Sequence, residues 1–183
     1  MAIASTQIEE LPQIEELPIP VTSTTPLAGF AELYERHYQA VFRAALRITG
    51  RPADAEDVLQ TVFLRVIAQG ARGRVEDVEQ PAAYFRRAAV NAAVDVLRRR
   101  ELHAESAYDD LAPHAAVQPR LLLKEQLRRA IAAMDSEDAS LFLLRHVEGL
   151  SIEELAGMFK IEKNNVAVRL HRIRHRLQAE MKR

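Results

Sequence analysis

The sequence predicts an all-helical protein that is built from two small helical domains. Apolar residues recur every three or four positions from residue 30 to residue 177, which is the period of an α-helix. Only 5% of the residues are aromatic, and cores of Ala, Leu and Val suit two small bundles better than one large one. An acidic stretch at 101–120 contains two prolines and is predicted to be a flexible linker between the domains.

The first 26 residues are predicted to form a flexible acidic tail. They repeat the hexapeptide QIEELP, at 7–12 and again at 13–18, and they hold four Glu and no basic residue. Prolines at this density prevent a continuous helix. The repeat gives no indication of a function.

The segment 27–100 is predicted to form three helices, of which the first two cover residues 30–48 and 52–69. Gly50 follows the first helix and can adopt the left-handed conformation that ends many helices. His37 lies on the apolar side of the first helix and is interpreted as a core or boundary histidine. The apolar face of the second helix is broad and includes Ile67.

The second helix begins with three carboxylates, Asp54, Glu56 and Asp57. Negative charge in the first turn is stabilised by the helix dipole, which explains this cluster without a function. A catalytic or metal site needs convergent partners from elsewhere, and no His or Cys lies nearby in the sequence. We therefore expect no enzyme, no metal and no cofactor.

The third helix is predicted over 81–100 and has one mixed polar face. An aromatic ring, an amide, a carboxylate and two guanidinium groups align on it: Tyr84, Arg87, Asn91, Asp95 and Arg98. Rings and guanidinium groups stack on unpaired bases, and an amide can read a base edge. This face is therefore predicted to contact single-stranded nucleic acid, although the arginines at 98–100 also complement the C-terminal helix dipole.

Two further helices, in the segment 122–147, lead into a predicted helix-turn-helix. Ser151 and Glu154 form a capping box at the start of its first helix, 152–159. Its second helix has one apolar stripe: Val166, Leu170, Ile173 and Leu177. The segment 163–183 holds seven basic residues and one acidic residue. Such a helix fits the phosphate-lined major groove of DNA, and the alternative is a solvated amphipathic helix.

The composition restricts the other classes of function. The net charge is −1, but the basic residues are segregated from the acidic tail and linker, so nucleic-acid binding is not excluded. The absence of cysteine excludes disulfides and thiolate zinc sites, and no apolar run is long enough to span a membrane, so the expected location is cytoplasmic. His171 and His175 have the spacing of a zinc-protease helix, but the Glu that such a helix requires is missing.

Three motifs, in this order, resemble those of the extracytoplasmic-function sigma factors, the small members of the bacterial sigma-70 family. DAEDVLQTVFLRV, at 54–66, resembles the helix by which this group binds core RNA polymerase. YFRRAAVNAAVDVLRRR, at 84–100, resembles its promoter-melting helix. GLSIEELAGMFKIEKNNVAVRLHRIRHRL, at 149–177, resembles its upstream-element reader. The resemblance covers roughly residues 30–181.

The resemblance implies a sigma factor whose region 2 (27–100) and region 4 (121–183) are joined by the linker. Such a protein binds RNA polymerase core, recognises the −35 and −10 promoter elements, melts the promoter and initiates transcription of a specific regulon. The residues implied in polymerase binding are Asp54, Glu56, Asp57, Gln60 and Phe63. Those implied in downstream-element binding and melting are Arg72, Arg74, Tyr84, Arg87, Asn91, Arg98 and Arg99, with a flipped base held by the loop 70–80. Those implied in upstream-element binding are Lys163, Asn164, Asn165, Val168, Arg169, His171 and Arg172.

The partners implied are the β′ clamp helices and β flap of the polymerase core, promoter DNA and an anti-sigma factor, without insertion into a membrane. Some residues depart from the family pattern: Tyr84 replaces Trp, Lys160 a turn Gly, and Val168 a frequent Ser. A shifted promoter preference is therefore expected. The alternative is a helix-turn-helix regulator that acts as a dimer without polymerase. It leaves Tyr84 and the acidic cluster unexplained, and no dimerisation element is visible.

Overall fold

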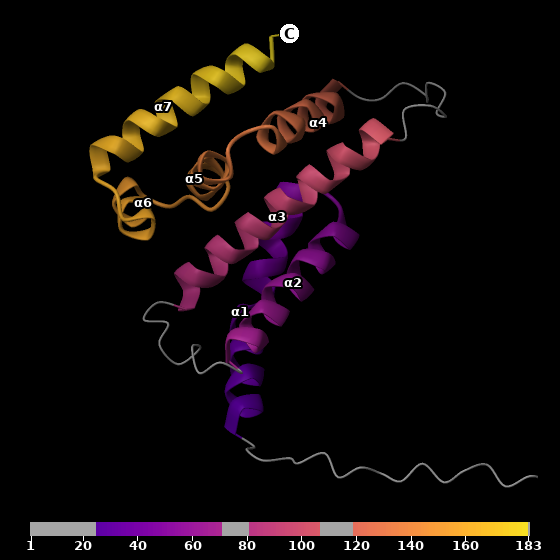
Figure 1. Ribbon diagram of the computed structural model, residues 1–183, viewed down its shortest axis with the longest axis vertical. Helices are drawn as coiled ribbons and strands as arrows, with labels where there is room; N and C mark the ends of the chain where they lie inside the picture. Colours follow the sequence, from indigo (N-terminus) through magenta and orange to yellow (C-terminus); the bar gives the residue numbers. More distant parts are fainter. Residues whose placement is uncertain (1–24, 71–80, 107–118, 183) are drawn as a thin grey trace, which may run out of the picture.

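The computed structural model describes residues 25–70, 81–106 and 119–182. Within these ranges the chain forms seven α-helices and no strand, which confirms the predicted fold class (Figure 1). The helices are α1 (Thr25–Thr49), α2 (Pro52–Gly70), α3 (Pro81–Ser106), α4 (Pro119–Ala132), α5 (Ser136–His146), α6 (Ile152–Phe159) and α7 (Lys163–Glu180). Most of the predicted tail and most of the loop 70–80 lie outside the described residues.

Three predicted boundaries were wrong. α1 begins at Thr25, inside the predicted tail, with Pro26 in its first turn, where a missing N–H is tolerated. α3 continues beyond residue 100 to Ser106, because the residues that follow are acceptable in a helix and contain neither Gly nor Pro. Pro119 opens α4 instead of breaking the chain. The predicted linker was therefore too long at both ends, and its middle lies outside the described residues.

α1, α2 and α3 pack against one another in a three-helix bundle (Figure 1). Its core consists mainly of valine and alanine, which allow close approach of the helices: Val41, Ala45, Val58, Val62, Ala89, Val90 and Ala93. Phe63 and Phe85 lie in the same core with ring centroids 5.2 Å apart. His37 stacks on Phe85 and is 9% exposed, which confirms its placement in the core. Burial, with a smaller contribution from Arg36, lowers the pKa of His37.

Ile67 is 48% exposed, so its predicted place on the buried face of α2 was wrong. Val66 takes that place and is 3% exposed. Ile67 lies about 100° further round α2 than Val66, and this rotation carries it beyond the edge of the buried face.

The predicted start of α6 is confirmed. Ser151 and Glu154 form the capping box of α6, with bonds of 2.7 and 3.1 Å between side chains and backbone N–H groups. Asp135 caps α5 and accepts bonds from two backbone N–H groups. Lys160 ends α6 with a left-handed φ of 55°, where glycine would be less strained. Glu162 occupies the N-cap position of α7, but its side chain makes no capping bond.

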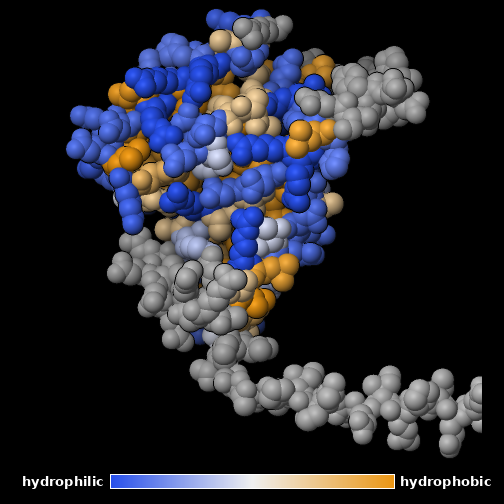
Figure 2. Space-filling model, viewed as in Figure 1, coloured by the Kyte–Doolittle hydropathy of each residue, from blue (hydrophilic) through white to orange (hydrophobic). Residues whose placement is uncertain are grey.

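The two halves of the chain lie side by side along α3. α3 contacts α4 and α5 on one side and α1 and α2 on the other (Figure 1). The buried residues of both halves form one connected cluster. On the face shown in Figure 2 most of the surface is hydrophilic, with apolar residues in smaller patches. The connection between the domains is therefore a packed interface in addition to a linker.

Candidate nucleic-acid and polymerase interfaces

α7 presents most of the predicted upstream-element residues on its exposed side. The exposed members are Lys163, Asn164, Asn165, Val168, His171 and Arg172. The apolar stripe predicted for this helix is buried against α4, α5 and α6. Val168 is 47% exposed, so an apolar side chain lies within the polar face. Lys163 ties the start of α7 to α6, because its Nζ lies 3.1 Å from Oε1 of Glu153.

Arg169 is the exception, because its side chain turns toward α5. Its Nη2 donates to Oδ1 of Asp138 at 2.8 Å, and its Nη1 lies 3.2 Å from Oε2 of Glu137. Burial opposes the charge of Arg169, but the hydrogen bonds that it donates to the two carboxylates outweigh this effect and raise the pKa of the guanidinium. Arg169 therefore holds α7 on α5.

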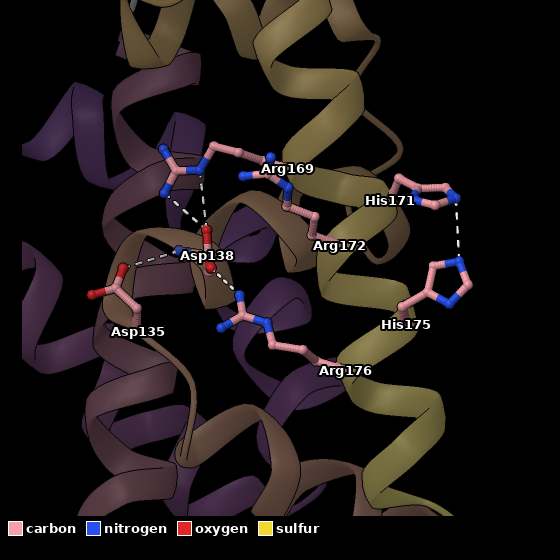
Figure 3. A pocket seen from close by; sticks show the side chains of 7 residues that line it. All are labelled: Asp135, Asp138, Arg169, His171, Arg172, His175 and Arg176. Carbon is pink, nitrogen blue, oxygen red and sulfur yellow. Dashed lines mark hydrogen bonds and ion pairs between the residues drawn. The ribbon is translucent and has the colours of Figure 1, made fainter.

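Asp138 joins two turns of α7, because Arg176 contacts its second carboxylate oxygen (Figure 3). The side chain of Asp138 is only 15% exposed, so a nearly buried carboxylate is satisfied by two arginines. A shallow hollow beside α7 is lined by these three residues and by Asp135, Arg172, His171 and His175. His171 and His175 point away from Asp138, with their Nε2 atoms 3.2 Å apart (Figure 3).

α2 exposes three of the five residues that were predicted to bind polymerase: Glu56, Asp57 and Gln60. The other two lie behind this surface. Asp54 is largely buried, with Oδ2 3.2 Å from Nη1 of Arg100, and Phe63 is 4% exposed. Two apolar residues of α2, Leu64 and Ile67, are 62% and 48% exposed.

Sequence reasoning missed the exposed apolar pair on α2. The available signal was the position of Leu64, which lies two residues from both Val62 and Val66, on the other side of the helix. Exposed leucine and isoleucine side chains beside acidic residues suit an apolar protein partner with basic groups at its edge.

The predicted melting face of α3 is partly covered by the second half of the chain. Nη1 of Arg87 donates to the carbonyl of Met158 at 2.8 Å, and its guanidinium lies 4.7 Å from the ring of Phe159. Oδ1 of Asn91 accepts a bond of 2.6 Å from Oγ of Ser140.

Other members of this face are placed differently. Nη2 of Arg98 donates to the carbonyl of Met134 at 2.6 Å. Tyr84 is half-buried and meets Phe85 edge to face, with ring centroids 5.6 Å apart. Arg99 is exposed. Arg72 and Arg74 lie outside the described residues.

Two general features limit the chemistry of the described part of the chain. It contains no group of three or more His, Cys, Asp or Glu residues arranged to hold a metal ion. None of its helices is both long enough and apolar enough to cross a membrane.

A capped helix, α6, is followed by an exposed basic helix, α7, in an all-helical chain. This is the arrangement of a helix-turn-helix DNA-binding protein. Two family models match the sequence: sigma-70 region 2 over residues 33–102 and sigma-70 region 4 over residues 124–177. The RNA polymerase sigma-E factor of Streptomyces coelicolor is 31% identical over 159 residues, which are 83% of this chain and 85% of that protein. The chain therefore belongs to the sigma-70 family of RNA polymerase sigma factors, in the extracytoplasmic-function group.

Other relatives agree with this assignment. The RNA polymerase sigma factor CarQ of Myxococcus xanthus is 32% identical over 148 residues, covering 79% of this chain and 84% of that one. The extracytoplasmic-function sigma factor SigM of Mycobacterium tuberculosis is 29% identical over 150 residues, covering 81% of this chain and 75% of that protein. The names of these relatives denote transcription initiation factors and not enzymes, which agrees with the non-enzymatic role expected from the sequence.

Proposed function

We propose that this sigma factor binds core polymerase through α2, reads the upstream promoter element with α7, and melts the downstream element with α3. The observation that carries the proposal is that the two sides of α7 differ, one being apolar and buried and the other polar and exposed. This helix buries its apolar stripe and exposes six of the seven residues predicted to contact DNA. A helix held in this way can enter a major groove without loss of its own packing.

The polymerase-binding face is the exposed side of α2. Glu56, Asp57 and Gln60 form its polar part, and Leu64 and Ile67 add apolar area toward the C-terminal end of the helix. Burial of apolar side chains supplies most of the affinity of such interfaces, whereas charges at the rim select the partner. In this proposal the exposed face of α2 binds the β′ clamp helices of the polymerase, and region 4 binds the β flap.

The melting face is α3, with Tyr84 and Asn91 offering a ring and an amide to unpaired bases. Unstacking a base costs a few kcal/mol, and stacking together with phosphate contacts offsets this cost. A face of this kind has no use on a closed duplex, because base faces are then inaccessible. The proposal places the protein in the cytoplasm with polymerase, and includes an anti-sigma factor as a regulatory partner.

Reconstituted run-off transcription tests the proposal. Purified chain is added to core polymerase on a library of bacterial promoter fragments, and transcripts are mapped. We expect transcripts that require both the chain and particular promoter sequences. Absence of any chain-dependent transcript across the library would refute it. Specific protection of duplex DNA by the chain alone would favour a regulator that works without polymerase.

A further inference from the structure

His171 and His175 form a close pair of imidazole rings on the exposed side of α7. Their Nε2 atoms lie 3.2 Å apart, and their ring centroids lie 4.4 Å apart with an angle of 55° between the ring planes (Figure 3). Residues four positions apart lie one above the other on the same side of a helix, so the backbone of α7 itself brings the two rings together. The two ring nitrogens are therefore close to each other without the help of any other element.

The separation of these two nitrogens matches the spacing that one metal ion requires of two ligands. Zinc bonds to imidazole nitrogen at about 2.0–2.1 Å, so an ion bound to both Nε2 atoms at their present separation has an N–metal–N angle of about 100–105°. This angle lies between the values of about 90° for a square-planar site and about 109° for a tetrahedral site. The pair thus has the geometry of a chelate.

The surroundings of the pair select the kind of ion. Imidazole nitrogen suits Zn²⁺, Ni²⁺ and Cu²⁺, whereas Ca²⁺ and Mg²⁺ require oxygen ligands. The same hollow is lined by two aspartates and three arginines: Asp135, Asp138, Arg169, Arg172 and Arg176. Asp135 caps α5, and Asp138 is bonded to Arg169 and Arg176, so both carboxylates already have partners. The site therefore favours a transition metal, with water molecules as the remaining ligands.

The Glu that a zinc-protease helix carries between its two histidines is replaced here by Arg172. In such a helix the two histidines bind the metal and the Glu is the general base of catalysis. Its absence therefore argues against hydrolysis but not against metal binding. Within the described residues no third His, Cys, Asp or Glu joins the pair, whereas a structural zinc site has four protein ligands. A site with two protein ligands binds its ion reversibly and is not needed for folding.

We propose that His171 and His175 bind one exchangeable divalent transition-metal ion through their Nε2 atoms, and that the bound ion prevents α7 from reading the upstream promoter element. The second part rests on the proposed function. His171 is one of the α7 residues assigned to DNA, and its Nε2 cannot bond to a base edge while it ligates a metal. The ion and its water ligands also lie within one turn of Val168 and Arg172, on the side of α7 that enters the groove.

Calorimetric titration of the full chain with Zn²⁺ tests the binding site. We expect one ion to bind per chain at the pair. His171→Ala and His175→Ala should each weaken this binding about tenfold or more, because a single imidazole remains. His103→Ala is the matched control, since it removes an exposed histidine of α3, and its affinity for Zn²⁺ should equal that of the parent. Excess Mg²⁺ should leave the Zn²⁺ titration unchanged.

A relocated histidine tests the geometry of the pair. His175→Ala combined with Gln178→His keeps the number of histidines but places the second one about 10 Å from His171 along α7. This variant should bind Zn²⁺ no better than His175→Ala, and circular dichroism checks that it is folded. The inference is overturned if the parent binds no Zn²⁺, if His103→Ala loses as much affinity as the two pair variants, or if the relocated histidine restores the affinity of the parent.

Promoter binding tests the effect of the ion on recognition. Core polymerase is assembled with the parent or with His175→Ala, and the affinity for a promoter found by run-off transcription is measured with and without Zn²⁺. Without Zn²⁺ the two should bind alike, because His175 is not among the residues assigned to DNA. Zn²⁺, at the concentration that fills the site of the parent, should weaken promoter binding severalfold for the parent only.

An equal effect of Zn²⁺ on the parent and on His175→Ala would arise elsewhere on the polymerase or the DNA, and would overturn the second part of the inference. Absence of specific promoter binding by the parent without Zn²⁺ would instead refute the proposed function. The calorimetric result does not depend on polymerase or DNA, so it separates failure of the metal site from failure of the proposed function.

Discussion

Two arginines that look equivalent in the sequence, Arg169 and Arg172, have different surroundings in the structure. Arg172 is exposed on α7, whereas Arg169 and Arg176 share the carboxylate of Asp138. At about 100° per residue Arg169 lies about 60° from Val166, at the edge of the buried stripe. Its inward turn was therefore accessible to sequence reasoning, but its partner on α5 was not.

The first prediction concerns this cluster. Asp138→Ala should lower the free energy of unfolding by about 1–2 kcal/mol, because two arginines lose a nearly buried partner. Arg172→Ala, at an exposed position of the same helix, should change it by less than about 0.5 kcal/mol. Urea unfolding followed by far-ultraviolet circular dichroism measures both. Equal stability of Asp138→Ala and the parent would show that Asp138 does not hold α7.

The second prediction concerns Val168, whose exposed side chain can cover a thymine methyl group in the major groove. Val168→Ser should relax the preference at one base pair of the upstream element by about 1–3 kcal/mol. Ala179→Ser, an exposed change in the last turn of α7, serves as the control. A scan of base substitutions in the promoter measures both variants. Unchanged preference at every position would make Val168 an incidental surface residue.

At the scale of the helices, caps explain why α5 and α6 begin where they do. Asp135 and Ser151 each accept bonds from backbone N–H groups of the first turn. The capping box of α6 was predicted from the sequence because a cap depends on residues within one turn of each other. The C-terminal end of α3 and the start of α4 were not predicted in this way. For α3, no strong stop signal precedes residue 107.

The third prediction concerns pH and the cap of α5. Hydrogen bonds from the N–H groups of Glu137 and Asp138 lower the pKa of Asp135 below its ordinary value of 3.8. Because the folded-state pKa is the lower one, this stabilisation is complete above pH 3.8 and is lost as the pH falls through the folded-state value.

Asp135→Asn keeps a capping side chain but removes the titrating group, so the melting temperature should fall less steeply with acidification below that pH. Glu162→Gln, at the N-cap of α7 without a capping bond, should leave the slope as it is in the parent. Thermal unfolding between pH 2 and pH 5 gives the slopes. A parent-like slope in Asp135→Asn would contradict the role assigned to this carboxylate.

At the scale of the whole molecule, the sequence predicted the two helical domains but not how they meet. Periodicity and caps are local, whereas Arg87 and Met158 are 71 residues apart and are brought together only by the packing of region 4 on α3. The mixed face of α3 was visible, and so were its chemical groups. What covers that face depends on the relative placement of two domains, which no local pattern contains.

The central claim is that α3 captures the melted promoter strand, and Asn91 tests it most directly. Asn91→Ala removes the amide, whereas Ser140→Ala removes only its partner across the interface, so the pair separates strand capture from domain contact. The measurement is the fraction of open promoter, read from permanganate reactivity of unpaired thymines, on duplex and pre-melted templates with core polymerase. We predict about a tenfold loss for Asn91→Ala on the duplex, no loss for Ser140→Ala, and recovery of Asn91→Ala on the pre-melted template. Parent-like opening by Asn91→Ala on the duplex, or an equal loss on both templates, would contradict the account.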